Sequence, residues 1–248
     1  MTPAKADSML GRLLLISTST VHGSGYLEYC IEAIGAFLRG TSKVLFVPYA
    51  RPSGITYDEY TAKARARFVD IGIDLTGIHE ARDARDAVNS AEALFTGGGN
   101  TFLLLRDLYR AEVLDAIRSR VAGGMPYIGT SAGSNVAGLT IGTTNDMPIV
   151  YPPSFDALGL VPFNINPHYL DPDPSSTHKG ETRETRINEF HVLNAQPVVG
   201  LREGAMLRVS GDSMRLEGST GARLFRAGRQ AEEFAPGADM SFLFSAPK

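Results

Sequence analysis

Short apolar runs alternate with segments of helical periodicity through the first half of the chain. The apolar runs are continuous, as in strands covered on both faces, and occupy residues 12–17, 43–48, 73–78, 93–96 and 125–128. Apolar side chains recur at helical spacing over 26–38, 57–69, 101–108 and 112–121. Strands that alternate with helices predict βαβ units, a parallel sheet and right-handed crossovers. In such a sheet, the residues that follow the strands meet over one crevice.

The second half of the chain has a different pattern. Residues 141–160 contain prolines and few helix formers, which predicts loops with short extended pieces. A helix is expected over 180–194 and a last sheet strand over 197–203. Residues 206–234 alternate apolar and polar positions, as antiparallel hairpins do. We therefore expect a single α/β domain (1–248) with a mostly parallel central sheet, helices on both faces and C-terminal antiparallel hairpins.

Composition and charge narrow the class of protein. Hydrophobic residues make up 43% of the chain and charged residues 21%, as in an ordinary soluble protein. The net charge of −3 gives no electrostatic attraction to nucleic acid or to an anionic membrane. The one cysteine, Cys30, allows no internal disulfide and no zinc cluster. Residues 1–10 lack an apolar signal core and are expected to be a flexible extension, and no run approaches the about 20 residues that span a bilayer. A cytoplasmic enzyme is the expectation, and homo-oligomerisation stays open.

The clearest chemical motif is the Gly-Thr-Ser-Ala-Gly turn at 129–133, which follows an apolar run. Its two glycines leave room for a tight strand-to-helix turn, and that turn would expose the Ser131 hydroxyl as a nucleophile elbow does. Free backbone N–H groups at the start of the following helix suit an oxyanion. Because G-x-S-x-G also arises by chance, a closely packed structural turn is the alternative interpretation.

Other candidate site residues follow strands or open helices. Three glycines at 97–99 lack P-loop and dinucleotide spacing, so they either bring backbone N–H groups close to a substrate carbonyl or form a flexible turn. His168 follows a proline and precedes a flexible segment, which fits a general base, although a lone histidine is commonly structural. Arg183 lies in the first turn of a helix, where a cation opposes the dipole. It either binds an anion or pairs with a nearby glutamate. The remaining histidines are expected to be structural: His22, His79, His178 and His191.

Five motifs in one order resemble the peptidase E family of aspartyl dipeptidases. They are Gly-Gly-Gly-Asn-Thr at 97–101, the Ser-Ala-Gly elbow, Thr-Thr-Asn-Asp-Met-Pro-Ile-Val at 143–150, Asn-Pro-His at 166–168 and His-Lys-Gly-Glu-Thr-Arg at 178–183. The resemblance implies a single α/β domain, no metal or other cofactor, and hydrolysis of dipeptides with an N-terminal aspartate. The chain departs from the family at Thr130, where tryptophan is common.

The resemblance also assigns roles to residues. It implies that Ser131 is the nucleophile, that His168 is the base and that Arg183 holds the aspartyl side chain of the substrate. The backbone N–H groups of Gly99 and Ala132 would then form the oxyanion hole.

Two acids compete to orient His168. Glu203 is expected at a strand tip, where the family fold implies a glutamate beside the histidine, and Asp146 lies in a motif that the family associates with activity. We rank Glu203 as the orienting acid and keep Asp146 as a site residue that holds the loop or the substrate amine. Thr130 and Asn100 are further candidates for substrate contact.

Other functions stay open at this point. The elbow is also similar to that of cyanophycinases, so a cyanophycinase-like or isoaspartyl dipeptidase acting on β-linked substrates is one alternative. A non-catalytic small-molecule binder on the same sheet is another. A glutaminase-like amidotransferase has a similar elbow but usually uses cysteine, and Cys30 is far from the elbow in the sequence.

Overall fold

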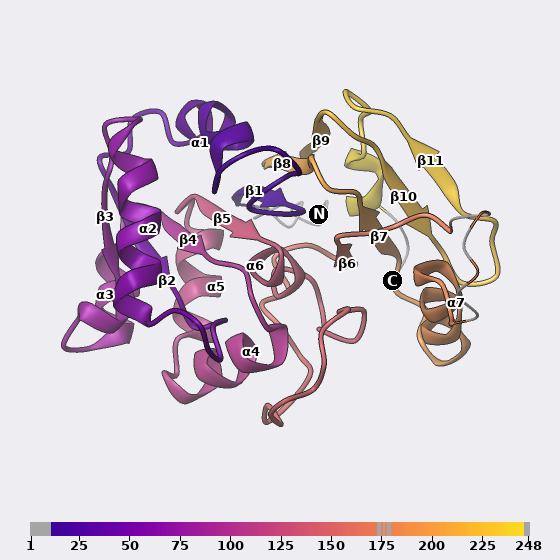
Figure 1. Cartoon of the computed structure of the whole chain (residues 1–248), viewed down its shortest axis with the longest axis horizontal. Helices are drawn as coiled ribbons and strands as arrows, with labels where there is room; N and C mark the ends of the chain where they lie inside the picture. Colours follow the sequence, from indigo (N-terminus) through magenta and orange to yellow (C-terminus); the bar gives the residue numbers. More distant parts are fainter. Residues whose placement is uncertain (1–10, 173–174, 176, 178–179, 246–248) are drawn as a thin grey trace, which may run out of the picture.

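The fold is organised by two β-sheets that lie side by side in Figure 1. The computed structural model describes residues 11–172, 175, 177 and 180–245. The larger sheet has seven strands in the order β3-β2-β4-β5-β1-β8-β9. These strands are β1 (Arg12–Ile16), β2 (Lys43–Val47), β3 (Asp74–Gly77), β4 (Leu94–Thr96), β5 (Tyr127–Thr130), β8 (Ala205–Ser210) and β9 (Ser213–Gly218). The first five pair in parallel, and β8 and β9 extend the sheet antiparallel beyond β1.

Helices cover both faces of the larger sheet because its strands are apolar on both sides. In β1, Leu13 and Leu15 belong to one buried cluster, while Leu14 and Ile16 belong to another. The predicted parallel sheet with helices on both faces is therefore confirmed. On the Leu14 face pack α1 (Ile31–Phe37) and α2 (Tyr57–Val69), and on the Leu13 face pack α3 (Ala84–Ser90), α4 (Thr101–Arg110) and α5 (Leu114–Ala122). Two short 3₁₀ helices are η2 (Ile78–Glu80) and η3 (Ser241–Phe244).

The smaller sheet has four strands in the order β11-β10-β7-β6. These are β6 (Asn164–Pro167), β7 (Val198–Leu201), β10 (Ala222–Phe225) and β11 (Glu232–Phe234). β6 and β7 are parallel, whereas β10 and β11 are antiparallel to their neighbours. The helix α7 (Arg183–Leu193) packs on this sheet through Ile187, which lies in a buried cluster with Val198 and Phe225. The hairpins predicted over 206–234 are thus divided between the two sheets.

The strand expected over 197–203 is β7, but it does not join the parallel sheet. β8 already pairs with that edge of β1, where Leu15 lies opposite Leu207. β7 pairs instead with β6, a strand that the polar sequence at 164–167 did not predict. The second sheet is therefore the main feature of the architecture that the sequence pattern missed.

Helix limits differ from the sequence prediction for local reasons. The segment predicted over 26–38 starts as the 3₁₀ helix η1 (Glu28–Cys30), because the preceding Leu27 has a φ of 57°. The helix predicted from residue 180 begins later, because Thr182 Oγ1 accepts a hydrogen bond from the Thr185 N–H and caps it. α3 was not predicted, since Val88 is its one buried residue. The extension expected at 1–10 lies outside the described residues.

Candidate active site

The elbow predicted at 129–133 is present at the tip of β5. Ser131 has a φ of 53° and a ψ of −111°, an uncommon conformation for a residue with a side chain, and α6 (Ala132–Asn135) begins directly after it. A Cβ on Gly133 would collide with the Thr96 carbonyl, so glycine is required there. Because α6 has only four residues, it provides free backbone N–H groups for an anion but no long helix dipole.

A line of hydrogen bonds joins Ser131, His168 and Glu203. The Ser131 Oγ lies 2.9 Å from His168 Nε2, and His168 Nδ1 lies 2.7 Å from Glu203 Oε1. These distances match the serine, base and orienting acid arrangement of serine hydrolases. His168 also has a positive φ of 53°, and such strained conformations persist where the surroundings hold them.

The two parallel strands β6 and β7 bring His168 and Glu203 together. Pro167 lies opposite Leu201 in their register, so His168 and Glu203 follow at neighbouring strand ends. Ser17, at the tip of β1, locks this corner: its Oγ accepts the His168 N–H at 2.9 Å and donates to the Leu201 carbonyl at 2.8 Å. Ser17 thereby connects the two sheets beside the elbow. Its only sequence signal was its place directly after a strand.

Asp146 lies apart from this line of hydrogen bonds. Its Oδ2 accepts from both the N–H and the Oγ1 of Thr101 at 2.7 Å, at the first residue of α4. Asn100 caps the same helix, because its Oδ1 accepts from the Leu103 N–H at 3.0 Å while its Nδ2 donates to the Met147 carbonyl at 2.9 Å. A carboxylate at a helix N-terminus is favourable. These contacts fasten the 143–150 loop to α4.

The glycine loop after β4 lies against the elbow. A Cβ added to Gly98 would lie 3.0 Å from the Ser131 Cβ, so the two backbones are close. The fully buried Tyr60 holds this loop, since its hydroxyl accepts the Gly98 N–H at 3.0 Å and lies 3.2 Å from the Gly98 carbonyl. Within the described part of the chain, the N–H groups of Gly99 and Ala132 donate to no protein acceptor. These are the two N–H groups that the resemblance in sequence implies for the oxyanion hole.

Arg183 is the first residue of α7 and is half-buried. Burial lowers its pKa from the ordinary arginine value, the Arg186 charge adds to this, and the Asp146 charge opposes it. Arg183 makes no hydrogen bond or ion pair among the described residues, which leaves its guanidinium available. Thr130 is different: its side chain is fully buried below the elbow, and its Oγ1 has no described partner.

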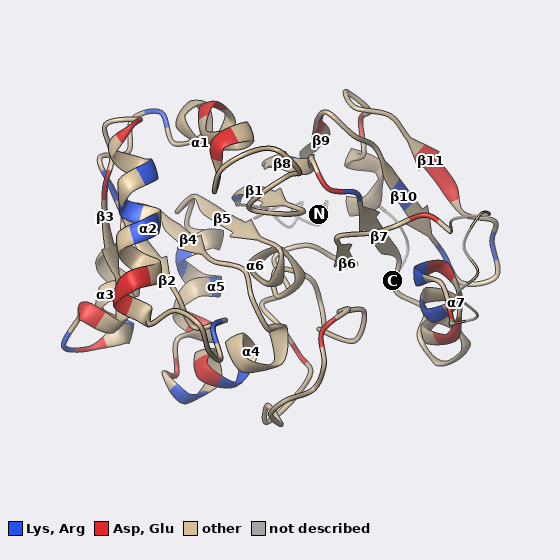
Figure 2. Cartoon of the chain, viewed as in Figure 1, with Lys and Arg blue, Asp and Glu red and all other residues tan. Residues whose placement is uncertain are grey.

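Charged side chains fasten the smaller sheet to the segment after His168. Arg202 donates to Asp171 at 2.7 and 2.8 Å and to Glu233 at 3.0 and 3.1 Å. Figure 2 shows acidic and basic segments together on α7, β10 and β11. Arg202 directly precedes Glu203, so this network holds both chain segments that carry the His168 and Glu203 pair.

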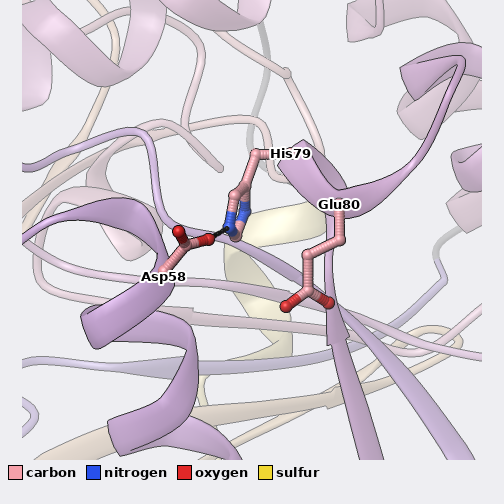
Figure 3. A group of neighbouring side chains, drawn as sticks. All are labelled: Asp58, His79 and Glu80. Atoms are coloured by element: carbon pink, nitrogen blue, oxygen red, sulfur yellow. Dashed lines mark hydrogen bonds and ion pairs between the residues drawn. The ribbon is translucent and has the colours of Figure 1, made fainter.

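One group of candidate metal ligands occurs among the described residues. Ligand atoms of Asp58, His79 and Glu80 lie within 4.8 Å of one another beside the edge strand β3 (Figure 3). His79 Nε2 lies 2.9 Å from Asp58 Oδ1, and Arg65 is in contact with Glu80 at 2.8 Å. Because Arg65 already neutralises Glu80, we assign these contacts to packing of α2 on η2. His191 contacts the Gln196 carbonyl, and His178 lies outside the described residues.

A half-buried serine elbow at the carboxyl end of the interior strand β5, with a histidine and a carboxylate beside it, is the arrangement of a serine hydrolase on an α/β fold. The model of peptidase family S51 matches residues 13–217. The chain belongs to this family and is a serine-type peptidase. The resemblance to the peptidase E family is thus confirmed.

Curated relatives agree with the family assignment, and solved structures share the fold. Peptidase E of Streptomyces coelicolor is 54% identical over 231 residues, which cover 93% of this chain and 94% of the relative. A Drosophila melanogaster protein named probable alpha-aspartyl dipeptidase is 50% identical over 234 residues, which cover 93% and 96%. The crystal structure of a peptidase from an acI-B1 actinobacterium shares the fold with a TM-score of 0.73 at 16% identity, covering 94% of this chain and 97% of that one. A putative peptidase E protein from Listeria monocytogenes has a TM-score of 0.65 at 20% identity, covering 85% and 99%.

The described helices were also compared with the length of a bilayer span. None of them combines enough length with enough apolar character to cross a membrane.

Proposed function

We propose that this peptidase hydrolyses α-aspartyl dipeptides through a Ser131, His168 and Glu203 triad. The observation that carries the proposal is the continuous hydrogen-bonded line from the Ser131 Oγ through the imidazole to Glu203, with distances of 2.9 and 2.7 Å. Relatives named peptidase E and probable alpha-aspartyl dipeptidase support the substrate class.

The reaction is acyl transfer in two steps. Ser131 Oγ attacks the carbonyl carbon after the N-terminal aspartate while His168 Nε2 takes the hydroxyl proton. His168 then gives this proton to the leaving amine as the C–N bond breaks, and an acyl-enzyme remains. Water, deprotonated by His168, then attacks the ester carbon, the ester C–O bond to Ser131 breaks, and His168 returns the proton to the Ser131 Oγ as aspartate leaves. Glu203 accepts from Nδ1–H, holds the tautomer and stabilises the imidazolium.

Two backbone N–H groups are proposed to stabilise the charge that develops on the attacked carbonyl oxygen. Among the described residues, the N–H groups of Gly99 and Ala132 have no protein acceptor. Ala132 directly follows Ser131, and Gly99 follows Gly98, which lies against Ser131. Such donors stabilise the transition state more than the ground state when they are fixed in advance. Tyr60 supports this fixation through its hydrogen bonds with Gly98.

Arg183 is proposed to bind the side-chain carboxylate of the aspartyl residue. A half-buried guanidinium without a partner in the described part of the chain is suited to a carboxylate, which it can bind through two parallel hydrogen bonds. Asp146 is proposed to hold the loop near this site through Thr101 rather than to orient His168.

A side-by-side assay of four dipeptides tests the proposal: α-aspartyl-leucine, β-aspartyl-leucine, asparaginyl-leucine and glutamyl-leucine. We expect kcat/KM for α-aspartyl-leucine to exceed that for asparaginyl-leucine by at least about 100-fold, because the neutral analogue leaves the Arg183 charge unpaired. The kcat/KM for glutamyl-leucine should be low, because one added methylene displaces the side-chain carboxylate from the Arg183 guanidinium. Comparable cleavage of the aspartyl and asparaginyl peptides would refute the assignment of Arg183, and preference for the β-linked peptide would make the enzyme an isoaspartyl dipeptidase.

A further inference from the structure

Two half-buried arginines, Arg51 and Arg183, have no hydrogen-bond acceptor or ion-pair partner among the described residues. The other arginine side chains in the described part of the chain that lack such a partner are exposed: Arg39, Arg82 and Arg229. The Arg51 Nε is buried without an acceptor among the described residues. Four other arginines have such an Nε, but each of them makes another hydrogen bond or ion pair: Arg67, Arg120, Arg223 and Arg226. Buried donors are nearly always paired in native proteins, so an unpaired one calls for a ligand or another explanation.

Arg51 is connected to the glycine loop beside Ser131. It follows Ala50, whose carbonyl accepts the Asn100 N–H at 2.7 Å. Its guanidinium carbon lies 4.5 Å from the centre of the Tyr60 ring, and the Tyr60 hydroxyl binds the Gly98 N–H. Cation–π contact of this kind holds the guanidinium over the ring while leaving its N–H donors unpaired.

The two half-buried arginines belong to chain segments on either side of the elbow helix α6. Arg51 lies in the connection from β2 to α2, and Arg183 opens α7. In Figure 1, α2 and α7 lie on opposite sides of α6, the helix that follows Ser131. Lys63 adds a second positive charge on the α2 side, because its ammonium lies 5.0 Å from the centre of the Tyr26 ring, next to Tyr60.

We propose that Arg51 binds the free C-terminal carboxylate of the dipeptide, on the leaving-group side of the scissile bond. This inference rests on the proposed function, because a dipeptide with an N-terminal aspartate carries two carboxylates, one on each side of that bond. With Arg183 assigned to the aspartyl carboxylate, Arg51 is the half-buried arginine that remains for the second carboxylate. The free carboxylate lies one residue beyond the attacked carbonyl, so its recognition limits the substrate to two residues.

Removal of the C-terminal charge from the substrate tests Arg51 directly. Wild type, Arg51→Met and Arg39→Met are compared on aspartyl-leucine and on aspartyl-leucine amide, with Arg39→Met as the control for an exposed arginine. For wild type and Arg39→Met, we expect kcat/KM to fall by about 10- to 100-fold on amidation, the loss of one charged hydrogen-bonded contact. For Arg51→Met, aspartyl-leucine should fall by the same factor and the amide should be unchanged, so that the preference disappears.

The ratio between the two substrates separates recognition from a structural role. If Arg51 merely supported Tyr60, Arg51→Met would slow both substrates equally and the preference would persist, which would overturn the proposal. Arg51→Lys keeps the positive charge but lacks the paired N–H donors of a guanidinium, so it should keep part of the preference for the free carboxylate. The thermal midpoint of each variant checks that it is folded. A wild type that prefers aspartyl- over asparaginyl-leucine but ignores amidation would refute the role of Arg51 and leave the proposed function standing. A wild type that cleaves neither aspartyl peptide would overturn both.

Discussion

Glu203→Gln is the substitution that tests the arrangement of the site most informatively, because it keeps the shape and removes the charge. The carboxylate oxygen lies 2.7 Å from His168 Nδ1, and the Glu203 and His168 side chains are 52% and 37% exposed. Two unit charges about 4 Å apart interact by about 1 kcal/mol in water and about 4 kcal/mol at an effective dielectric constant of about 20. This half-exposed pair lies between these limits.

The loss of electrostatic stabilisation of the imidazolium gives an expected range for the fall in kcat. Since about 1.4 kcal/mol changes a rate tenfold, kcat should fall by about 5- to 1,000-fold. A buried triad aspartate replaced by its amide loses about 10⁴-fold, and solvent screening makes the loss smaller here.

Steady-state kinetics on aspartyl-leucine measures this, with thermal midpoints as the control for folding. Asp146→Asn is the comparison variant, because Asp146 binds Thr101 and not His168. Its loss should appear mainly in KM, through the loosened loop. A near-normal kcat for Glu203→Gln beside an inactive Asp146→Asn would refute the reasoning and make Asp146 the orienting acid.

Two further predictions concern single side chains. Arg183→Met should lower kcat/KM for aspartyl-leucine by about 10- to 100-fold, and unchanged steady-state kinetics would contradict this. Its free energy of unfolding should stay the same or rise by up to about 1 kcal/mol in a thermal melt, because the substitution removes a cation from a helix N-terminus. Burial raises the pKa of the Cys30 thiol to about 12. Iodoacetamide at neutral pH should therefore neither modify Cys30 nor inactivate the folded enzyme. Rapid inactivation, with the modification mapped to Cys30 by mass spectrometry, would contradict this prediction.

Much of the fold was predictable because it follows from the pattern of apolar residues within each strand and helix. Continuous apolar runs such as that of β1 require cover on both faces, and this requirement produces the layered parallel sheet. The elbow was predictable for the same reason, since its glycines are demanded by contacts within a few residues and by the neighbouring strand. β6 was not predictable, because its buried Asn164 and Asn166 form side-chain hydrogen bonds with Thr140 and Thr143, which lie more than twenty residues earlier in the chain.

The residues of the candidate site could be proposed from the sequence, but their geometry could not. Glu203 and Asp146 were both acids near predicted loops, and the parallel register that sets Pro167 opposite Leu201 is what brings Glu203 to His168. No sequence rule states that register. Arg51 had no sequence signal, because an arginine after a strand is ordinary until the fold shows that it has no partner.

Covalent labelling by a fluorophosphonate tests the central claim, that Ser131 is an activated nucleophile, most directly. Ser134 is the matched control, since its Oγ is buried and donates to the Ile16 and Gly129 carbonyls at 2.7 and 2.8 Å. We predict one phosphonylated residue, Ser131, in wild type and in Ser134→Ala. In Ser131→Ala, labelling should be absent and the turnover of aspartyl-leucine lower by several orders of magnitude at an unchanged thermal midpoint. Labelling that persists in Ser131→Ala, or more than about a tenth of the wild-type rate in that variant, would contradict the account.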